Sequence, residues 1–129
     1  MAKVTQYETE GGRVPFAEWF DSLGAKAAAK VTSAATRMEL GNFGDHKSVG
    51  GGVWERRINF EKGYRFYYAK DGEDFVLLFC GGTKSQQQSD IDQAKQYWKD
   101  YKHRKAKIKK AAVSVKSKPQ LKKKPRRNR

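Results

Sequence analysis

The chain has 129 residues, about the length of one domain, and carries 28 Lys and Arg against 14 Asp and Glu. The excess positive charge lies in one segment: residues 1–101 hold equal numbers of basic and acidic residues, whereas residues 102–129 hold 14 basic residues and no acid. The sequence lacks a long apolar run and a signal peptide's apolar stretch, and its one cysteine, Cys80, excludes an internal disulfide. We therefore expect a reduced, cytoplasmic protein with no membrane contact, metal or other cofactor, whose basic tail binds a polyanion such as nucleic acid.

The first part of the chain predicts an edge strand and two helices. The strand is expected over Lys3–Thr9, before Gly11-Gly12. Pro15 begins a helix that Gly24 ends, with an apolar stripe formed by Phe16, Trp19, Phe20 and Leu23. A second, alanine-rich helix is expected over Ala25–Leu40, with Ala28, Val31, Ala35 and Met38 on its buried face.

The middle of the chain predicts a glycine-rich loop and three antiparallel strands. The loop spans Asn42–Gly52, and the strands span Val53–Phe60, Tyr64–Lys70 and Phe75–Cys80, the last ended by Gly81-Gly82. A final helix is expected from Ser89 to about residue 101. Residues 102–129 then form a basic tail whose first residues extend this helix and whose final dozen residues are disordered.

The two central strands predict a sheet with two unlike faces, because successive side chains of a strand point to opposite sides. A three-residue turn at 61–63 would pair Phe60 with Tyr64, Ile58 with Phe66, Asn59 with Arg65 and Arg57 with Tyr67. One face is then apolar and can be covered by the helices. The other face carries Glu55, Arg57, Arg65 and Tyr67, with Lys84 just past the third strand, and we expect it to be open to a ligand.

Three segments of the sequence resemble a known toxin superfamily. They are GNFGDHKSVGGGVWERRI, GYRFYY and LLFCGGTKSQQQSDIDQA, and in this order and spacing they are similar to RelE/ParE proteins. The similarity is closest to the HigB-like branch, the "addiction module killer proteins" of type II toxin–antitoxin systems. It covers roughly residues 7–101 and leaves out the basic tail.

The resemblance implies a fold, an activity and partners. The fold is α+β and RelE-like: a curved antiparallel sheet with two N-terminal helices and a short C-terminal helix. The activity is cleavage of mRNA at the ribosome by an endoribonuclease. The partners are mRNA, the ribosome and a cognate antitoxin, a helix-turn-helix DNA-binding protein.

The resemblance also implies the catalytic residues. Relatives place catalytic residues on the strand that here holds Glu55 and Arg57. The arginine of their GYR element matches Arg65, and the basic residue after their glycine turn matches Lys84. Many relatives have a histidine or tyrosine near the C-terminus, where this chain has Gln86–Asp90, so the general acid is not identified.

Cleavage of RNA without a metal makes three chemical demands. The 2′-hydroxyl must lose a proton, the crowded phosphate must be stabilised and the 5′-oxygen must leave. We expect Glu55 to be the base, Arg57 and Arg65 to bind phosphate oxygens, and Lys84 to add charge or donate a proton. Further candidates for contact with RNA are Lys47, Arg56, Tyr67, Lys105, Lys109, Lys110, Lys123 and Arg126.

The sequence also fits two other functions. One is a non-catalytic nucleic-acid-binding module on a RelE-like scaffold, and the other is a ParE-like toxin that acts on a protein target such as gyrase. Glu55, Arg57 and Arg65 favour the endoribonuclease. The missing C-terminal histidine or tyrosine favours the alternatives.

Overall fold

The computed structural model describes the backbone of residues 2–116 and the side chains of residues 2–111. The chain divides into two compact units, Met1–Lys99 and Asp100–Arg129, and each is described by itself. The disorder predicted for the final dozen residues falls outside the described part of the chain. Within residues 2–116, no helix is both long enough and apolar enough to cross a membrane.

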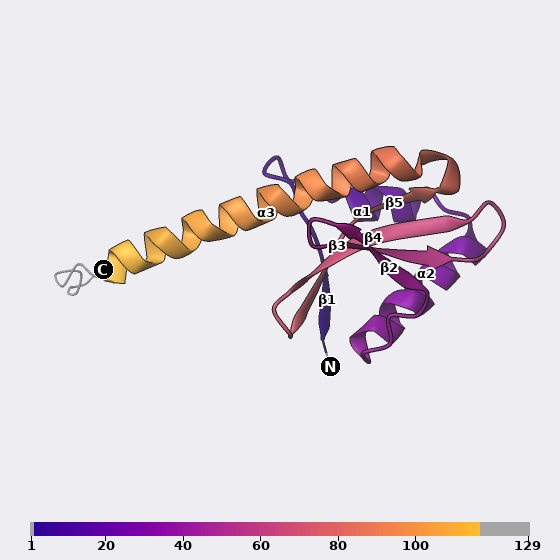
Figure 1. The fold of residues 1–129 in the computed structure, drawn as a ribbon, viewed down its shortest axis with the longest axis horizontal. Helices are drawn as coiled ribbons and strands as arrows, with labels where there is room; N and C mark the ends of the chain where they lie inside the picture. The colour runs from indigo at the N-terminus through magenta and orange to yellow at the C-terminus, as the bar shows by residue number, and fades with distance from the viewer. Residues whose placement is uncertain (1, 117–129) are drawn as a thin grey trace. The chain divides into compact units, whose positions relative to one another are not determined.

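The first unit is built on one five-stranded, mostly antiparallel sheet with the order β1-β5-β4-β3-β2 (Figure 1). The strands are β1 (Lys3–Gln6), β2 (His46–Gly50), β3 (Val53–Ile58), β4 (Tyr64–Asp71) and β5 (Phe75–Thr83). Strands β2 to β5 pair antiparallel, and β1 pairs parallel with β5. The N-terminal edge strand is thus confirmed, although it ends at Gln6 and not at Thr9.

Strand β2 was not predicted, because it lies inside the segment that the sequence indicated as a loop. Its residues His46, Lys47 and Ser48 pair with β3, and a shift of register follows between Ser48 and Gly50. The glycines that dominate the local pattern form the β2–β3 connection, where Gly50, Gly51 and Gly52 all have positive φ.

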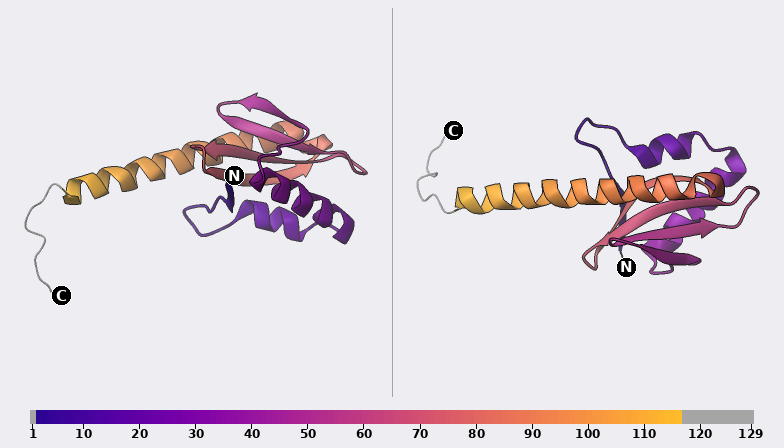
Figure 2. Two further views of the ribbon diagram at one scale, coloured as in Figure 1. Left: turned by 90° about the horizontal axis from the view of Figure 1, so that it is seen from below. Right: turned by 45° about the horizontal axis from the view of Figure 1, so that its top comes forward.

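Two helices, α1 (Pro15–Asp21) and α2 (Ala25–Glu39), cover one face of the sheet (Figure 2). Pro15 lies in the first turn of α1, as predicted. Gly24 is the N-cap of α2, whereas Ser22 is the C-cap of α1, so the predicted helix end was wrong by two residues.

The buried stripe of α2 also differs from the prediction. It consists of Ala27, Val31, Ala34 and Met38, whereas Ala28 and Ala35 are only partly buried. Both stripes follow the helical period through a run of alanines, so only the packing against the sheet decides between them.

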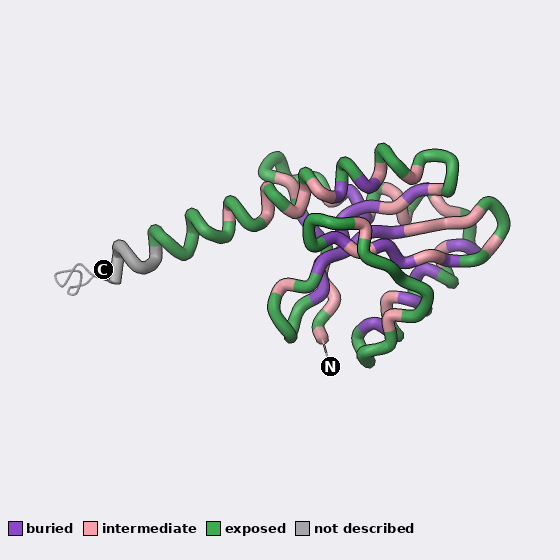
Figure 3. Tube along the Cα trace, viewed as in Figure 1, coloured by how far each residue is buried: buried purple, intermediate pink, exposed green. Residues whose placement is uncertain are grey.

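The main core lies between these helices and the sheet. Phe66 and Tyr68 of β4 are fully buried there, as is Met38 of α2, and Phe16 packs edge-on against Phe66 with ring centroids 5.6 Å apart. Figure 3 shows the buried residues concentrated along the central strands. The predicted apolar face of the sheet is therefore confirmed.

The opposite face of the sheet is also covered, contrary to the prediction that it would be open. A 3₁₀ turn, η1 (Lys84–Gln86), leads into α3 (Gln87–Lys116), which begins two residues before the predicted Ser89 and continues into the acid-free segment. Ile91 and Ala94 of α3 are buried, and the Trp98 ring lies 5.9 Å from that of Phe79 on β5. The apolar residues of this helix thus need the second face of the sheet for their burial.

Two consecutive glycines in β5 allow helices to approach both faces. Gly81 pairs with Phe66 and Gly82 with Arg65, so the strand continues through the glycines that were predicted to end it. A Cβ at Gly81 would lie 2.4 Å from the Trp19 ring of α1, and one at Gly82 would lie 1.9 Å from Oδ2 of Asp90 on α3. Only glycine fits at either position.

Candidate functional site

The register of the β3–β4 hairpin decides how the predicted site residues meet. The observed pairs are Trp54 with Tyr68, Glu55 with Tyr67, Arg56 with Phe66, Arg57 with Arg65 and Ile58 with Tyr64. The predicted register was wrong by two residues. A shift by an even number leaves every side chain on its predicted face, so Glu55, Arg57, Arg65 and Tyr67 do share one face.

The shift of register has a local cause in the turn. The connection spans residues 59–63 and is therefore longer than the predicted three-residue turn. Gly63 N–H donates to the carbonyl oxygen of Phe60 at 3.0 Å, and Glu61 and Gly63 both adopt positive φ.

This end of the hairpin forms a pocket of about 340 Å³ that collects cations. Arg57, Arg65 and Lys84, three of the four predicted catalytic residues, line it together. The pocket, hereafter the hairpin pocket, is completed by Asp45, Ile58, Asn59, Glu61, Lys62, Gly63 and Tyr64. Its four cationic side chains exceed its two carboxylates, so it suits an anionic ligand.

Lys84 joins the pocket through a backbone contact. Its N–H donates to the carbonyl oxygen of Gly63 at 3.1 Å, which ties the end of β5 to the β3–β4 turn. The side chain of Lys84 is exposed. The ammonium group is therefore free to move towards a phosphate at the pocket mouth.

Arg57 is held at the pocket wall by an ion pair with Asp45. Its Nη2 lies 2.8 Å from Asp45 Oδ1. The guanidinium hydrogen bond lowers the pKa of Asp45, so this carboxylate is ionised at neutral pH. Both side chains are partly exposed, so the pair orients Arg57 but contributes little to stability.

Glu55 lies behind the pocket and is fully buried. Its Oε2 accepts hydrogen bonds from Tyr67 Oη at 3.1 Å and from Gln87 Nε2 at 2.7 Å. Arg65 Nε lies 3.5 Å from the same oxygen, and the Arg65 side chain is 12% exposed. The expectation that Glu55 faces solvent was wrong, because the start of α3 covers it.

Tyr67 is buried by the same helix. Burial and the adjacent charge of Glu55 raise its pKa, so its hydroxyl stays protonated and donates to Glu55. The ring has no exposed surface on which a base could stack. The predicted role of Tyr67 in contact with RNA therefore does not fit its position.

Gln87 was not singled out from the sequence, although it belongs to the segment Gln86–Asp90 that replaces the histidine or tyrosine of relatives. It is the first residue of α3, and its amide reaches across to Glu55 of β3. The available signal was a long polar side chain in the polar segment that follows the two glycines of β5. That signal does not predict that the side chain of Gln87 would bind Glu55.

The remaining predicted contacts are dispersed. Lys47 is exposed on β2, and Arg56 is buried on the opposite face of the sheet from Arg57. Lys105, Lys109 and Lys110 are exposed on the part of α3 that belongs to the second unit. Lys123 and Arg126 lie outside the described residues. Within the described residues, no group of three or more His, Cys, Asp or Glu side chains is placed to hold a metal ion.

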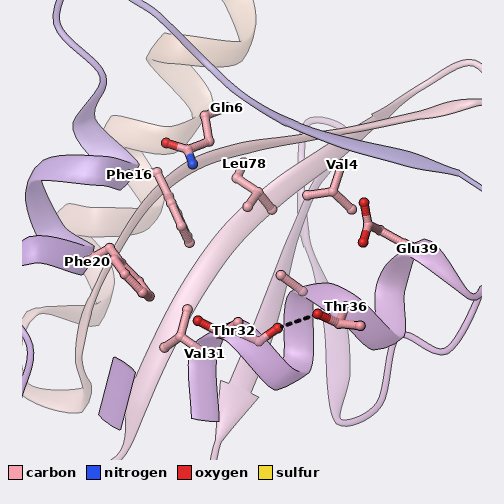
Figure 4. Close-up of a pocket in the computed structure, with 10 residues that line it drawn as sticks. Val4, Gln6, Phe16, Phe20, Val31, Thr32, Thr36, Glu39 and Leu78 are labelled. Carbon is pink, nitrogen blue, oxygen red and sulfur yellow. Dashed lines mark hydrogen bonds between the residues drawn. The ribbon is translucent and has the colours of Figure 1, made fainter. Parts of the chain in front are cut away.

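A second hollow, of about 240 Å³, is apolar in character (Figure 4). It lies between α1, α2 and the sheet, where Phe16, Phe20 and Val31 face Val4 and Leu78. Among the residues that line it, Glu39 has the one charged side chain. This hollow offers no cation for a phosphate, so the candidate site is the hairpin pocket.

Comparison with known proteins matches most of the chain to one protein family. A model of the phage-derived Gp49-like family (DUF891) matches residues 18–113, which include every residue of the hairpin pocket. An uncharacterized protein of Haemophilus influenzae is 44% identical over 81 residues, which cover 62% of this chain and 82% of that protein. The arrangement of two N-terminal helices, a mostly antiparallel five-stranded sheet and a long C-terminal helix is consistent with the RelE-like fold.

Proposed function

Because the chain belongs to the phage-derived Gp49-like family, which is related to RelE/HigB-like toxins, we propose that it is the toxin of a type II toxin–antitoxin system. Its proposed activity is cleavage of mRNA at the ribosome without a metal. The observation that carries this proposal is the convergence of Arg57, Arg65 and Lys84 in the hairpin pocket. The proposed site of action is the cytoplasm, and the proposed inhibitor is a helix-turn-helix antitoxin.

The proposed reaction is attack of a 2′-oxygen on the adjacent phosphorus. The bond from phosphorus to the 5′-oxygen breaks, which leaves a 2′,3′-cyclic phosphate and a 5′-hydroxyl. Arg57 and Arg65 bind the non-bridging oxygens and stabilise the charge that develops there. Lys84 lies beside them and stabilises or protonates the leaving 5′-oxygen.

We assign Glu55 a positioning role and not that of the base. A base must reach the proton that it removes, and Glu55 is enclosed by Tyr67, Gln87 and Arg65. Its carboxylate faces Arg65 Nε, and Arg65 Nη1 donates a long hydrogen bond to the Gly63 carbonyl oxygen at 3.4 Å, so Nη2 is the guanidinium nitrogen left for the pocket. The pocket itself holds two carboxylates: Asp45 is bound to Arg57, and Glu61 is exposed in the turn. We therefore propose Glu61 as the proton acceptor.

A direct test is expression of the protein followed by mapping of transcript 5′ ends. We expect growth arrest and new ends within translated codons, and we expect the purified protein to cut ribosome-bound mRNA to products with 5′-hydroxyl groups. Lys84→Ala should suppress cleavage, and Lys99→Ala, an exposed lysine that does not line the hairpin pocket, should not. Co-expression of the antitoxin should restore growth.

One observation favours a second candidate, a non-catalytic RNA-binding module. The burial of Glu55 removes the expected base, and the pocket retains its phosphate-binding cations. In that case the purified protein binds RNA and ribosomes but generates no new 5′ ends. Growth arrest with relaxed DNA topology and intact transcripts would instead indicate a ParE-like action on gyrase.

A further inference from the structure

A third pocket, of about 230 Å³, lies on the other face of β3 and shares Ile58 and Asn59 with the hairpin pocket. Its other lining residues are Lys30, Ser33, Arg37 and Arg56, and it is hereafter the helix pocket. Lys30, Ser33 and Arg37 are spaced three and four residues apart on α2, so they form one stripe of that helix. Arg56 comes from β3 and points to the opposite side of the strand from Arg57.

The helix pocket gathers three cations, and no carboxylate lines it. Arg56 is only 8% exposed, and its Nε is buried without a hydrogen-bond partner. One of its other nitrogens, Nη1, donates to the carbonyl oxygen of Arg57. A buried guanidinium with an unused donor is costly unless an acceptor supplies the missing bond.

The charges around Arg56 make binding of an anion beside its guanidinium more favourable. Burial lowers the pKa of this guanidinium, the carboxylate of Asp45 raises it, and the positive charge of Arg37 lowers it. The Asp45 carboxylate accepts hydrogen bonds from Arg57, on the other face of β3. Arg37 and Arg56 therefore repel each other across a space that an anion would fill favourably.

We propose that the helix pocket binds a second phosphate of the RNA strand whose neighbouring phosphate lies in the hairpin pocket. The donors match a phosphodiester: two guanidiniums, one ammonium, the Ser33 hydroxyl and the Asn59 amide. The shared wall at Ile58 and Asn59 places the two pockets next to each other, as consecutive phosphates require. The assignment of RNA as the ligand rests on the proposed function.

The test measures binding of a 2′-O-methyl pentanucleotide, which has no 2′-hydroxyl and cannot be cleaved. The full-length wild type is compared with Lys30→Ala, Arg37→Glu and the control Lys26→Ala, which changes an exposed lysine of α2 outside the pocket. We expect Arg37→Glu to weaken binding by about tenfold or more and to reduce the slope of log affinity against log salt by about 0.7 for each phosphate that the variant no longer binds. Lys30→Ala should act in the same direction, and Lys26→Ala should match the wild type.

The stability of the same variants separates loss of a site from loss of the fold. Arg37→Glu places a carboxylate opposite Arg56, so its midpoint of thermal unfolding should equal or exceed that of the wild type. If Lys30→Ala and Arg37→Glu bind like Lys26→Ala, with the same salt slope, the proposal is overturned. It is also overturned if inorganic phosphate stabilises the wild type but not Arg37→Glu while the affinity for the oligonucleotide is unchanged, because the pocket then serves a free anion.

The oligonucleotide test does not depend on catalysis. If the wild type binds the pentanucleotide through the helix pocket but does not cut ribosome-bound mRNA, the proposed endoribonuclease activity is refuted. The proposal of a phosphate site in the helix pocket is then still supported. A wild type that cuts mRNA with unchanged binding in both variants would refute the helix pocket alone.

Discussion

Arg65 lies at the boundary between the buried cluster and the hairpin pocket. Its Nε faces the fully buried Glu55, and the same side chain lines the pocket. Arg65→Ala would therefore leave a buried carboxylate without its cation, at a cost of about 3–5 kcal/mol. Loss of activity in the alanine variant could therefore reflect loss of the fold, so lysine is the better substitution.

We expect Arg65→Lys to fold with little loss of stability and to lower the cleavage rate by about 10²-fold, because an ammonium cannot replace the planar pair of donors. Single-turnover cleavage of ribosome-bound mRNA measures this effect. The matched control is Arg13→Lys, which alters an exposed arginine paired with Glu18. Equal cleavage rates for both lysine variants would show that Arg65 takes no part in the reaction.

Glu55→Gln separates positioning from proton transfer. Glutamine keeps the shape and still accepts hydrogen bonds from Tyr67 and Gln87, but it carries no charge for Arg65. We expect about a tenfold lower rate and an unchanged acidic limb of the pH–rate profile, since the proton acceptor is elsewhere. Disappearance of that limb in the glutamine variant would show that Glu55 is the base after all.

Asp90 provides a pH-dependent contribution to stability. Burial raises its pKa, and its Oδ2 is buried without a hydrogen-bond partner. The folded protein therefore holds this proton more tightly than the unfolded chain, and stability falls as pH rises from the ordinary aspartate pKa towards the raised value. We expect Asp90→Asn to raise the unfolding midpoint at pH 7 and to lose that advantage below about pH 4. The exposed Asp92→Asn, with the same change of charge, should show no such gain.

At the scale of elements, β5 is the strand against which α1 and α3 are docked. Gly82 faces Asp90 at the start of α3, and a Cβ there would lie 1.9 Å from its Oδ2 and 2.9 Å from its Cγ. We expect Gly82→Ala to reduce the free energy of unfolding by about 1–3 kcal/mol, because the carboxyl group of Asp90 must move away from the added methyl group. If the first turn of α3 moves with it, activity should also fall, since Gln87 on the same turn holds Glu55.

Urea denaturation of Gly82→Ala beside Gly11→Ala tests the element-scale prediction. A Cβ at Gly11 meets only Thr9, at an ordinary 3.9 Å. If both variants unfold at the same urea concentration, α3 does not depend on the glycine contact.

At the scale of the whole molecule, charge is divided between a neutral first part and a basic tail. Among the residues whose burial is described, every buried one lies at or before Ala94. Removal of residues 103–129 should therefore leave thermal stability nearly unchanged while it weakens attraction to RNA. Ribosome binding at several salt concentrations should show a flatter slope for the truncated chain, by about 0.7 for each single-strand phosphate that the tail binds. Parallel slopes would mean that the tail contacts no nucleic acid.

The sequence by itself determined the properties that depend on local pattern. The strands β3 and β4 follow from the alternation of apolar and polar residues, and α1 follows from Pro15 and its apolar stripe. The division into a neutral part and a basic tail follows from the distribution of charged residues along the chain. Even the two faces of the hairpin were correct, because a two-residue error of register preserves side-chain parity. The convergence of Arg57 and Arg65 follows from that parity.

Tertiary structure alone decided which of these residues meet solvent. The sequence pattern shows Glu55 and Tyr67 as polar residues on a strand face, but α3, which begins 32 residues after Glu55, covers them. Likewise, α2 brings Arg37 beside Arg56, and the turn length brings Lys84 to Gly63. Burial and charge pairing depend on contacts between distant segments, whereas periodicity records only the preference of each segment for a face. The sequence therefore predicted the chemical groups, and packing determined which of them lie in pockets and which lie behind them.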